Sequence, residues 1–177
     1  MVAKRYRALE MRVIAHDPYV RKEDVEAIGV QLTDLETLLK ESDIVSIHTL
    51  LSKETFHLIG EKELGLMKKT AIIVNTARGK LIDQKALYDA LKEKRIAAAG
   101  LDVLENEPPE ANDPILKLDN VVLTPHIAWL SLDSTNNLRT MVSEKTVSRF
   151  RATSKAPGQP ASFAEEGLAS SLSHQSL

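Results

Sequence analysis

Short apolar runs alternate with segments of helical spacing through most of the chain. Runs such as Ile44-Val45-Ser46-Ile47 and Ala71-Ile72-Ile73-Val74 are nearly continuous, which is typical of strands buried in a parallel sheet. The pattern predicts strands over residues 11–15, 29–32, 44–47, 70–75, 96–103 and 121–123. It predicts helices over residues 21–28, 33–43, 61–69, 83–94 and 132–151. Strands that alternate with helices predict an α/β fold, a doubly wound parallel sheet with helices on both faces.

The same pattern predicts where elements begin and where the domain ends. Thr33, with Glu36 three residues later, has the spacing of a capping box at the start of the helix over residues 33–43. Beyond residue 151 the chain is rich in Ser, Ala, Pro and Gly and has no periodic apolar face. We therefore expect one domain over residues 1–151 and a disordered tail over residues 152–177.

Composition excludes several classes of function. The 177 residues carry 23 basic and 25 acidic side chains, a net charge of −2, so no basic footprint for nucleic acid is present. The chain has no cysteine, which removes disulfides and thiolate metal sites, and its five histidines show no ligand spacing, so we expect no metal site. No apolar run approaches the ~20 residues needed to cross a membrane. We expect a cytoplasmic protein with no nucleic-acid or membrane partner.

Polar residues with useful chemistry follow the predicted strands. Ligands of open α/β sheets bind beyond the carboxyl ends of the strands, so these positions predict a single functional rim. The candidates are His16 and Asp17, His48 and Thr49, Asn75 to Arg78, Asp102 with Glu107, and Thr124 to His126.

Each candidate also has an ordinary structural explanation. Arg78 could be a solvated loop arginine, and His126 could be structural. Asp17 and Asp102 could cap turns or helices, and Glu107, which precedes two prolines, could be an exposed acid. The shared position at strand ends favours a functional interpretation.

Three blocks, VNTARG, GLDVLENEPP and NVVLTPHIAW, resemble the signature blocks of the D-isomer-specific 2-hydroxyacid dehydrogenases. The resemblance covers roughly residues 1–151. It implies a Rossmann-type fold that lacks its first strand and Gly-rich loop, because no G-x-G-x-x-G is present and the chain begins with what looks like the following helix. Without that central strand, either the sheet re-pairs or an edge stays open.

The resemblance also implies roles for individual residues. Arg78 would bind the substrate carboxylate, His126 would be the acid/base and Glu107 would orient it. Trp129 would border the substrate. The expected cofactor is NAD, and the expected cofactor contacts are Asp17, His48, Thr49, Thr76, Ala77, Arg78 and Asp102. Asp17 would bind the ribose hydroxyls, which favours NAD over NADP.

The implied function is hydride transfer between NAD(H) and a 2-keto or 2-hydroxy acid, reduced or absent in a chain truncated in this way. The alternatives are an NAD-sensing, corepressor-like protein-binding module and an inactive gene fragment. The sequence does not name the acid, and a homodimer is possible by analogy with the family.

Overall fold

Two separate parallel sheets form within residues 1–153, the part of the chain that this computed structural model describes. The smaller sheet pairs β1 (Val13–Ala15) with β2 (Val30–Leu32). The larger sheet has the order β3 (Ile44–Ile47), β4 (Ile72–Asn75), β5 (Ala98–Leu101) and β6 (Val121–Leu123). The predicted α/β class with parallel strands and flanking helices is confirmed.

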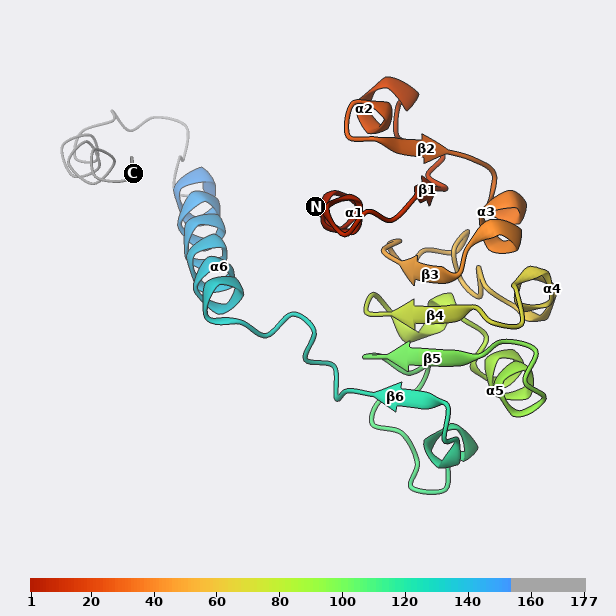
Figure 1. The fold of residues 1–177 in the computed structure, drawn as a ribbon. Coiled ribbons are helices and arrows are strands. Elements are labelled where there is room, and N and C mark those ends of the chain that lie inside the picture. Colours follow the sequence, from red (N-terminus) through yellow and green to blue (C-terminus); the bar gives the residue numbers. More distant parts are fainter. Residues whose placement is uncertain (154–177) are drawn as a thin grey trace. The chain divides into compact units, whose positions relative to one another are not determined.

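Three helices cover one face of the larger sheet (Figure 1). They are α3 (Leu35–Glu41), α4 (Glu61–Leu66) and α5 (Gln84–Lys92). Leu39, Leu64 and Leu87 bury completely against strand residues such as Ile73. The strands advance in one direction from β3 to β6, and right-handed crossovers that advance in one direction place their helices on the same face. Two 3₁₀ helices, η1 (Gly79–Leu81) and η2 (Pro114–Lys117), follow β4 and β5.

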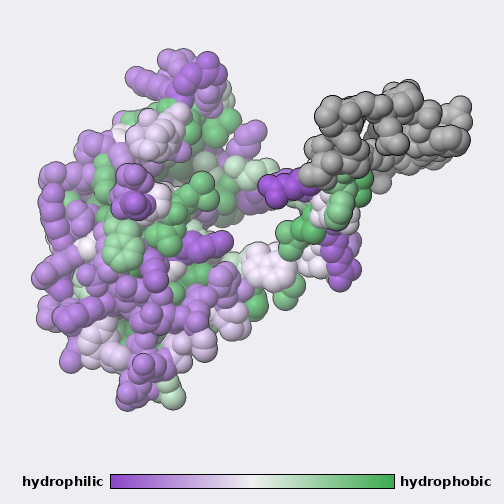
Figure 2. Space-filling view, turned by 180° about the vertical axis from the view of Figure 1, so that it is seen from behind, coloured by the Kyte–Doolittle hydropathy of each residue, from purple (hydrophilic) through white to green (hydrophobic). Residues whose placement is uncertain are grey.

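The opposite face of the larger sheet carries exposed apolar side chains. Ile44, Ile72 and Val122 point to that face and are 43, 37 and 71 % exposed. Their neighbours Val45 and Ile73, which point to the helices, are 5 and 0 % exposed. Figure 2 shows one side of the molecule, on which hydrophobic atoms lie uncovered among hydrophilic ones. Covering the second face requires crossovers in the opposite direction, and β3 to β6 contain none.

The edges of β1 and β3 are not paired with each other, as expected of a sheet that lacks its central strand. Helix α1 (Val2–Ala8) leads into β1, and α2 (Lys22–Glu26) connects β1 to β2. In Figure 1 the arrowheads of β3 to β6 point to one side, whereas that of β2 points to the opposite side. Since β1 is parallel to β2, the end of β1 does not belong to the rim formed by the larger sheet.

One predicted helix start is wrong by one residue. The side chain of Asp34, not Thr33, caps α3 by accepting the Thr37 N–H at 2.8 Å. Aspartate is as effective as threonine in this position, and a carboxylate also interacts favourably with the helix N-terminus. The predicted capping box with Glu36 therefore does not form; Glu36 binds Lys40 instead.

Contacts divide the chain into residues 1–128 and a second unit that starts at Trp129. The second unit contains α6 (Leu132–Thr153), whose start is stabilised by hydrogen bonds between Ser131 and Ser134. The predicted domain limit at residue 151 stays a prediction, and the predicted tail lies outside the described residues apart from the last turn of α6. None of the described helices is both long and apolar enough to cross a membrane.

The one-sided sheet predicts different costs for two adjacent isoleucines in β4. Ile73→Ala should lower the free energy of unfolding by about 2–5 kcal/mol, because it leaves a cavity in the core. Ile72→Ala should lower it by about 1 kcal/mol or less, because this side chain lies on the open face. Urea unfolding of both variants measures the difference, and equal losses would show that the second face is covered after all.

Candidate active site

A buried asparagine builds the turn that carries Arg78. Asn75, the last residue of β4, is 1 % exposed. Its Oδ1 accepts the Ala77 N–H at 3.0 Å, and its Nδ2 donates to the Arg78 carbonyl at 2.9 Å. Asparagine commonly closes turns in this way. The turn directs Arg78 away from the core, with its guanidinium exposed and one Nη1 hydrogen bond to the Ala77 carbonyl at 2.6 Å.

Gly79 lets two loops of the site cross in backbone contact. A Cβ at this position would lie 1.9 Å from the Leu104 carbonyl oxygen and 2.5 Å from the Glu105 nitrogen. No side chain fits at such distances, and a backbone neighbour does not rotate away. The glycine after Arg78 is therefore required by the loop that follows β5, which also carries Glu107.

The carboxylate of Asp102 organises the loop that follows β6. Asp102 comes directly after β5 and is 4 % exposed. One oxygen accepts the Thr124 hydroxyl and the Ile127 N–H (2.9 Å), and the other accepts the Ala128 N–H (2.9 Å). The His126 N–H donates to the Asp102 carbonyl at 2.9 Å. These bonds hold His126 in a left-handed backbone conformation (φ 54°), which costs of order 1–3 kcal/mol for a residue with a side chain.

Hydrogen bonding keeps Asp102 ionised despite its burial. Burial raises the pKa of this carboxyl, but the bonds from Thr124, Ala128 and Ile127 outweigh burial, and the net pKa is lowered. A carboxylate whose folded pKa is lowered stabilises the fold above its unfolded pKa, and this contribution disappears as the pH falls through the folded pKa. The loop of His126 therefore depends on a carboxylate that is charged at neutral pH.

Glu107 and His126 form a hydrogen-bonded pair at the mouth of the site, which is an ion pair when His126 is protonated. The Glu107 Oε2 lies 2.7 Å from the His126 Nδ1, and the Glu107 Oε1 accepts the Leu104 N–H at 2.9 Å. The two side chains are 37 and 43 % exposed, so solvent screens the pair. The bond to His126 lowers the pKa of Glu107 more than partial burial raises it, and the Leu104 N–H lowers it further.

Arg78, Glu107 and His126 line one open cavity of about 270 Å³. Lys80 and Glu105 add further charges to its wall, and Leu51, Val103 and Leu104 add apolar surface. The three residues predicted as catalytic are thus brought together from the loops after β4, β5 and β6. A cation, a titratable ring and an orienting carboxylate around one cavity can hold a small anion and exchange a proton with it.

The predicted cofactor contacts are brought together only in part. Thr76 and Ala77 lie in the turn of Arg78, and Asp102 lies beneath the His126 loop. His48 follows β3, where its Nε2 binds the Ser46 hydroxyl at 2.9 Å; partial burial lowers its pKa and the charge of the chain N-terminus adds to this. Thr49 follows it in the chain.

Asp17 and Trp129 are not among the residues that line this cavity. The Asp17 carboxylate accepts the Tyr19 N–H at 2.9 Å and so caps the turn after β1. In Figure 1, β2, to which β1 is parallel, points in the opposite direction to β3, β4, β5 and β6. Trp129 begins the second unit, is 51 % exposed, and its carbonyl accepts the Ser134 hydroxyl. Their predicted roles stay predictions.

Sequence reasoning named Asn75 but missed its role as the turn former, and it missed Gly79 as the crossing point and Glu105 as a cavity residue. A signal was available for the first two. Asn directly after a buried strand is typical of an Asx turn, and a glycine between charged residues is typical of close backbone approach. Glu105 differs from Glu107 only in its partners, which no local pattern contains.

The described residues fit the reacting end of a nicotinamide dinucleotide better than its adenosine end. The cavity beside Arg78 and His126 is open and has the donors that a keto acid over a nicotinamide requires. The pyrophosphate cradle is different, because the chain has no G-x-G-x-x-G, and the Asp17 carboxylate is engaged with the Tyr19 N–H. No group of three or more metal-ligating side chains occurs in the described part of the chain.

A family model and curated relatives both place this chain in one family. The family model "D-isomer specific 2-hydroxyacid dehydrogenase, NAD binding domain" matches residues 1–128. A glyoxylate reductase of Korarchaeum cryptofilum is 52 % identical over 147 residues, which are 82 % of this chain and 44 % of that protein. A D-3-phosphoglycerate dehydrogenase of Archaeoglobus fulgidus is 50 % identical over 146 residues, which are 82 % of this chain and 28 % of that protein.

The solved structures that this chain resembles include a dehydrogenase and a reductase. A D-lactate dehydrogenase of Aquifex aeolicus, complexed with NAD and lactic acid, has a TM-score of 0.79 at 37 % identity and covers 85 % of this chain and 50 % of its own. An acyclic imino acid reductase in complex with NADPH and D-Arg has a TM-score of 0.77 at 38 % identity, over 85 % of this chain and 47 % of its own. The chain thus spans half or less of the length of these relatives.

Gly79→Ala should destabilise the protein by about 3 kcal/mol or more, because the added methyl group overlaps backbone atoms of the loop from Leu104 to Glu105. Gly65→Ala is the matched control. A Cβ there meets nothing within 4 Å, so alanine inside α4 should be neutral or stabilising by up to about 1 kcal/mol. Thermal unfolding of both variants compares them, and a harmless Gly79→Ala would contradict the close crossing.

His126→Ala should raise the pKa of Glu107, because the His126 bond is the largest cause that lowers it below the ordinary value of 4.5. The expected result is a titration midpoint of the Glu107 side-chain carbon that moves upward in ¹³C NMR. His16→Ala, which removes a histidine that contacts the Thr33 carbonyl and does not line the cavity, is the control and should leave the midpoint in place. An unchanged midpoint in His126→Ala would show that the two side chains do not meet in solution.

Proposed function

Because the chain belongs to the D-isomer specific 2-hydroxyacid dehydrogenase family, we propose that it carries the catalytic groups for NAD(H)-dependent interconversion of a 2-keto acid and a 2-hydroxy acid. The observation that supports this proposal is the convergence of Arg78 with the Glu107–His126 pair on one cavity. Since the chain spans only part of its relatives, the activity of the whole protein is part of the proposal.

Arg78 anchors the substrate. Its guanidinium is exposed at the cavity wall, and the turn built by Asn75 holds its backbone. A planar guanidinium can donate two parallel hydrogen bonds to a carboxylate, which fixes the orientation of the acid as well as its position. The keto group is thereby directed toward His126 on the facing loop.

His126 exchanges the proton with the substrate oxygen. Glu107 binds Nδ1, so Nε2 is the ring nitrogen that meets the substrate. During reduction the imidazolium donates its proton to the carbonyl oxygen, and during oxidation the neutral ring accepts the hydroxyl proton. The Glu107 carboxylate orients the ring through its bond to Nδ1.

NADH, when bound, supplies the hydride for the keto carbon. We assign the nicotinamide end to the turn of Thr76 and Ala77, which precedes the cavity residue Arg78, and to Asp102 beneath the His126 loop. His48 and Thr49 lie in the loop that leads to Leu51, another residue of the cavity wall. Asp17 would bind the ribose hydroxyls only if β1 and β2 aligned with the larger sheet. A carboxylate there would favour NAD over NADP.

The substrate is a small 2-keto or 2-hydroxy acid. The relatives named above include a glyoxylate reductase and a phosphoglycerate dehydrogenase, and these names give the class and not the individual acid. Trp129 as a substrate neighbour, a homodimer and a cytoplasmic location stay predictions.

Arg78→Lys should lower the NADH-oxidation rate with glyoxylate or hydroxypyruvate on the order of 100-fold, because an ammonium group cannot hold the carboxylate in two-point contact. Absorbance at 340 nm measures the rate in the 177-residue chain. Arg12→Lys is the control, because Arg12 pairs with Glu41 on the surface and lies outside the cavity lining.

The proposal fails if the chain neither oxidises NADH with any small 2-keto acid nor shows chemical-shift changes at Arg78 and His126 when glyoxylate is added. It is also contradicted if Arg78→Lys retains the full rate. Folding of each variant is checked by circular dichroism, so that a loss of structure is not read as a loss of catalysis.

A further inference from the structure

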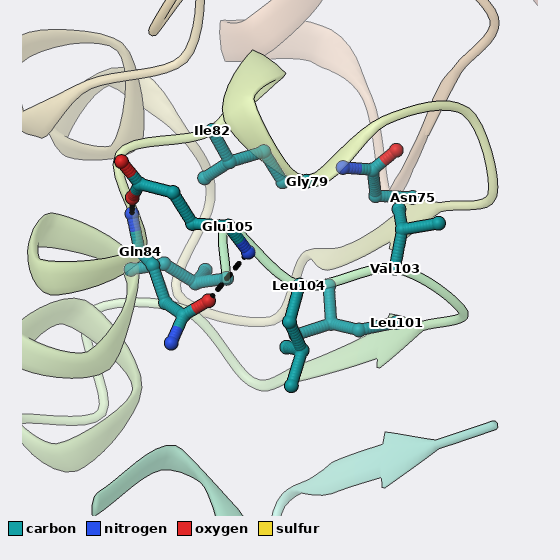
Figure 3. A pocket seen from close by; sticks show the side chains of 9 residues that line it. Asn75, Gly79, Ile82, Gln84, Leu101, Val103, Leu104 and Glu105 are labelled. Atoms are coloured by element: carbon teal, nitrogen blue, oxygen red, sulfur yellow. Dashed lines mark hydrogen bonds between the residues drawn. The ribbon is translucent and has the colours of Figure 1, made fainter. Parts of the chain in front are cut away.

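Glu105 lies two residues before Glu107 and has a different set of partners. Its side chain is 24 % exposed, and its Oε1 lies 3.0 Å from the His57 Nε2. Its Oε2 accepts the Gln84 N–H at 3.3 Å, and its own backbone N–H donates to the Gln84 Oε1 at 2.9 Å. Figure 3 shows both bonds between Glu105 and Gln84, the first residue of α5. Both carboxylate oxygens and the backbone N–H of Glu105 therefore have hydrogen-bond partners.

The partners of Glu105 are themselves fixed. Gln84 also donates through its Nε2 to Asp113 at 2.8 Å, which links α5 to the start of η2. The His57 N–H donates to the Lys80 carbonyl at 2.9 Å, and the His57 ring stacks on Phe56 with 3.9 Å between the ring centres. Glu105 is thus the point where the loop before α4, the N-terminus of α5 and the segment after β5 are joined.

The position of Glu105 affects the contact between Glu107 and His126. Leu104, the residue before Glu105, donates its N–H to the carboxylate of Glu107, and the backbone at Leu104 and Glu105 abuts Gly79. A shift of Glu105 therefore moves the donor that holds Glu107, and with it the carboxylate that holds His126. The same bonds keep the Glu105 charge engaged with His57 and Gln84, although it lines the cavity that contains Arg78.

We propose that Glu105 is a positioning residue for the reaction: anchored by His57 and Gln84, it sets the place of the segment from Leu104 to Glu107 and so aligns Glu107 with His126. This inference deepens the proposed function and rests on it for its catalytic meaning. Its structural content, that the junction controls the Glu107–His126 contact, is tested without turnover.

The test is the titration of Glu107 in the full 177-residue chain. With ¹³C-labelled glutamate, the Glu107 side-chain resonance is assigned by its loss in Glu107→Gln. In the wild type its midpoint should lie below 4.5, because His126 and the Leu104 N–H lower the pKa of this carboxyl. Glu105→Ala should move the midpoint upward toward 4.5, because both contacts loosen. Asp102, which also faces His126, is unchanged in every variant.

Two further variants separate positioning from plain stabilisation. Glu105→Gln should give an intermediate midpoint, because its amide oxygen and backbone keep part of the network. Glu63→Ala, which removes a hydrogen bond to the Gly60 N–H at the start of α4, is the matched control. It should lower the thermal unfolding midpoint and leave the Glu107 titration in place.

The proposal is overturned if Glu105→Ala lowers stability but leaves the Glu107 midpoint at its wild-type value. If Glu105→Ala does not fold, His57→Gln decides, because it removes only one anchor and should shift the midpoint in the same direction by less; no shift overturns the proposal. A shift without any keto-acid turnover sinks the dehydrogenase function and leaves the positioning role standing.

Discussion

The site depends on one buried carboxylate. Asp102 accepts three hydrogen bonds from the loop after β6, and its burial is tolerated because these donors replace water. The same bonds impose the left-handed backbone of His126, which an isolated loop would not adopt. Without these bonds the loop from Thr124 to Ala128 would lose the conformation that places the His126 ring beside Glu107. A residue that touches no cavity wall thus determines the geometry of those that do.

The remaining geometry follows from close contacts between neighbouring strand ends. The ends of β4, β5 and β6 are adjacent because these strands are parallel and paired, so their three loops can cross and share hydrogen bonds. Gly79 permits the closest of these crossings, and Glu105 anchors the middle loop to α5. The catalytic groups are therefore held by the loops that follow β4, β5 and β6, together with the start of α5, to which Glu105 is bonded. No residue of β1 or β2 lines the cavity, and these strands belong to another sheet.

The one-sided covering of the larger sheet has the same origin as the separation of β1 and β2. All crossovers from β3 to β6 turn in one direction, so their helices share a face. In a doubly wound sheet, the helices on the second face connect strands that lie on the other side of the point where the strand order reverses. In this chain those strands do not join the sheet, and Ile44, Ile72 and Val122 remain exposed.

Sequence alone determined the alternation of strands and helices, because buried strands leave local patterns. The residues that end these strands supplied the candidates, and the resemblance of three blocks to the family selected Arg78, Glu107 and His126 among them. The sequence also determined that no glycine-rich phosphate loop is present. Only the tertiary structure decided that Asp102 supports a loop, that Glu105 has other partners than Glu107, and that β1 and β2 form a sheet of their own. These facts depend on contacts between segments 20 or more residues apart, such as Gln84 with Glu105 and Asp102 with Ala128, and on the direction in which one sheet meets another. Such contacts are selected by the packing of the whole domain, which no local pattern of residues encodes.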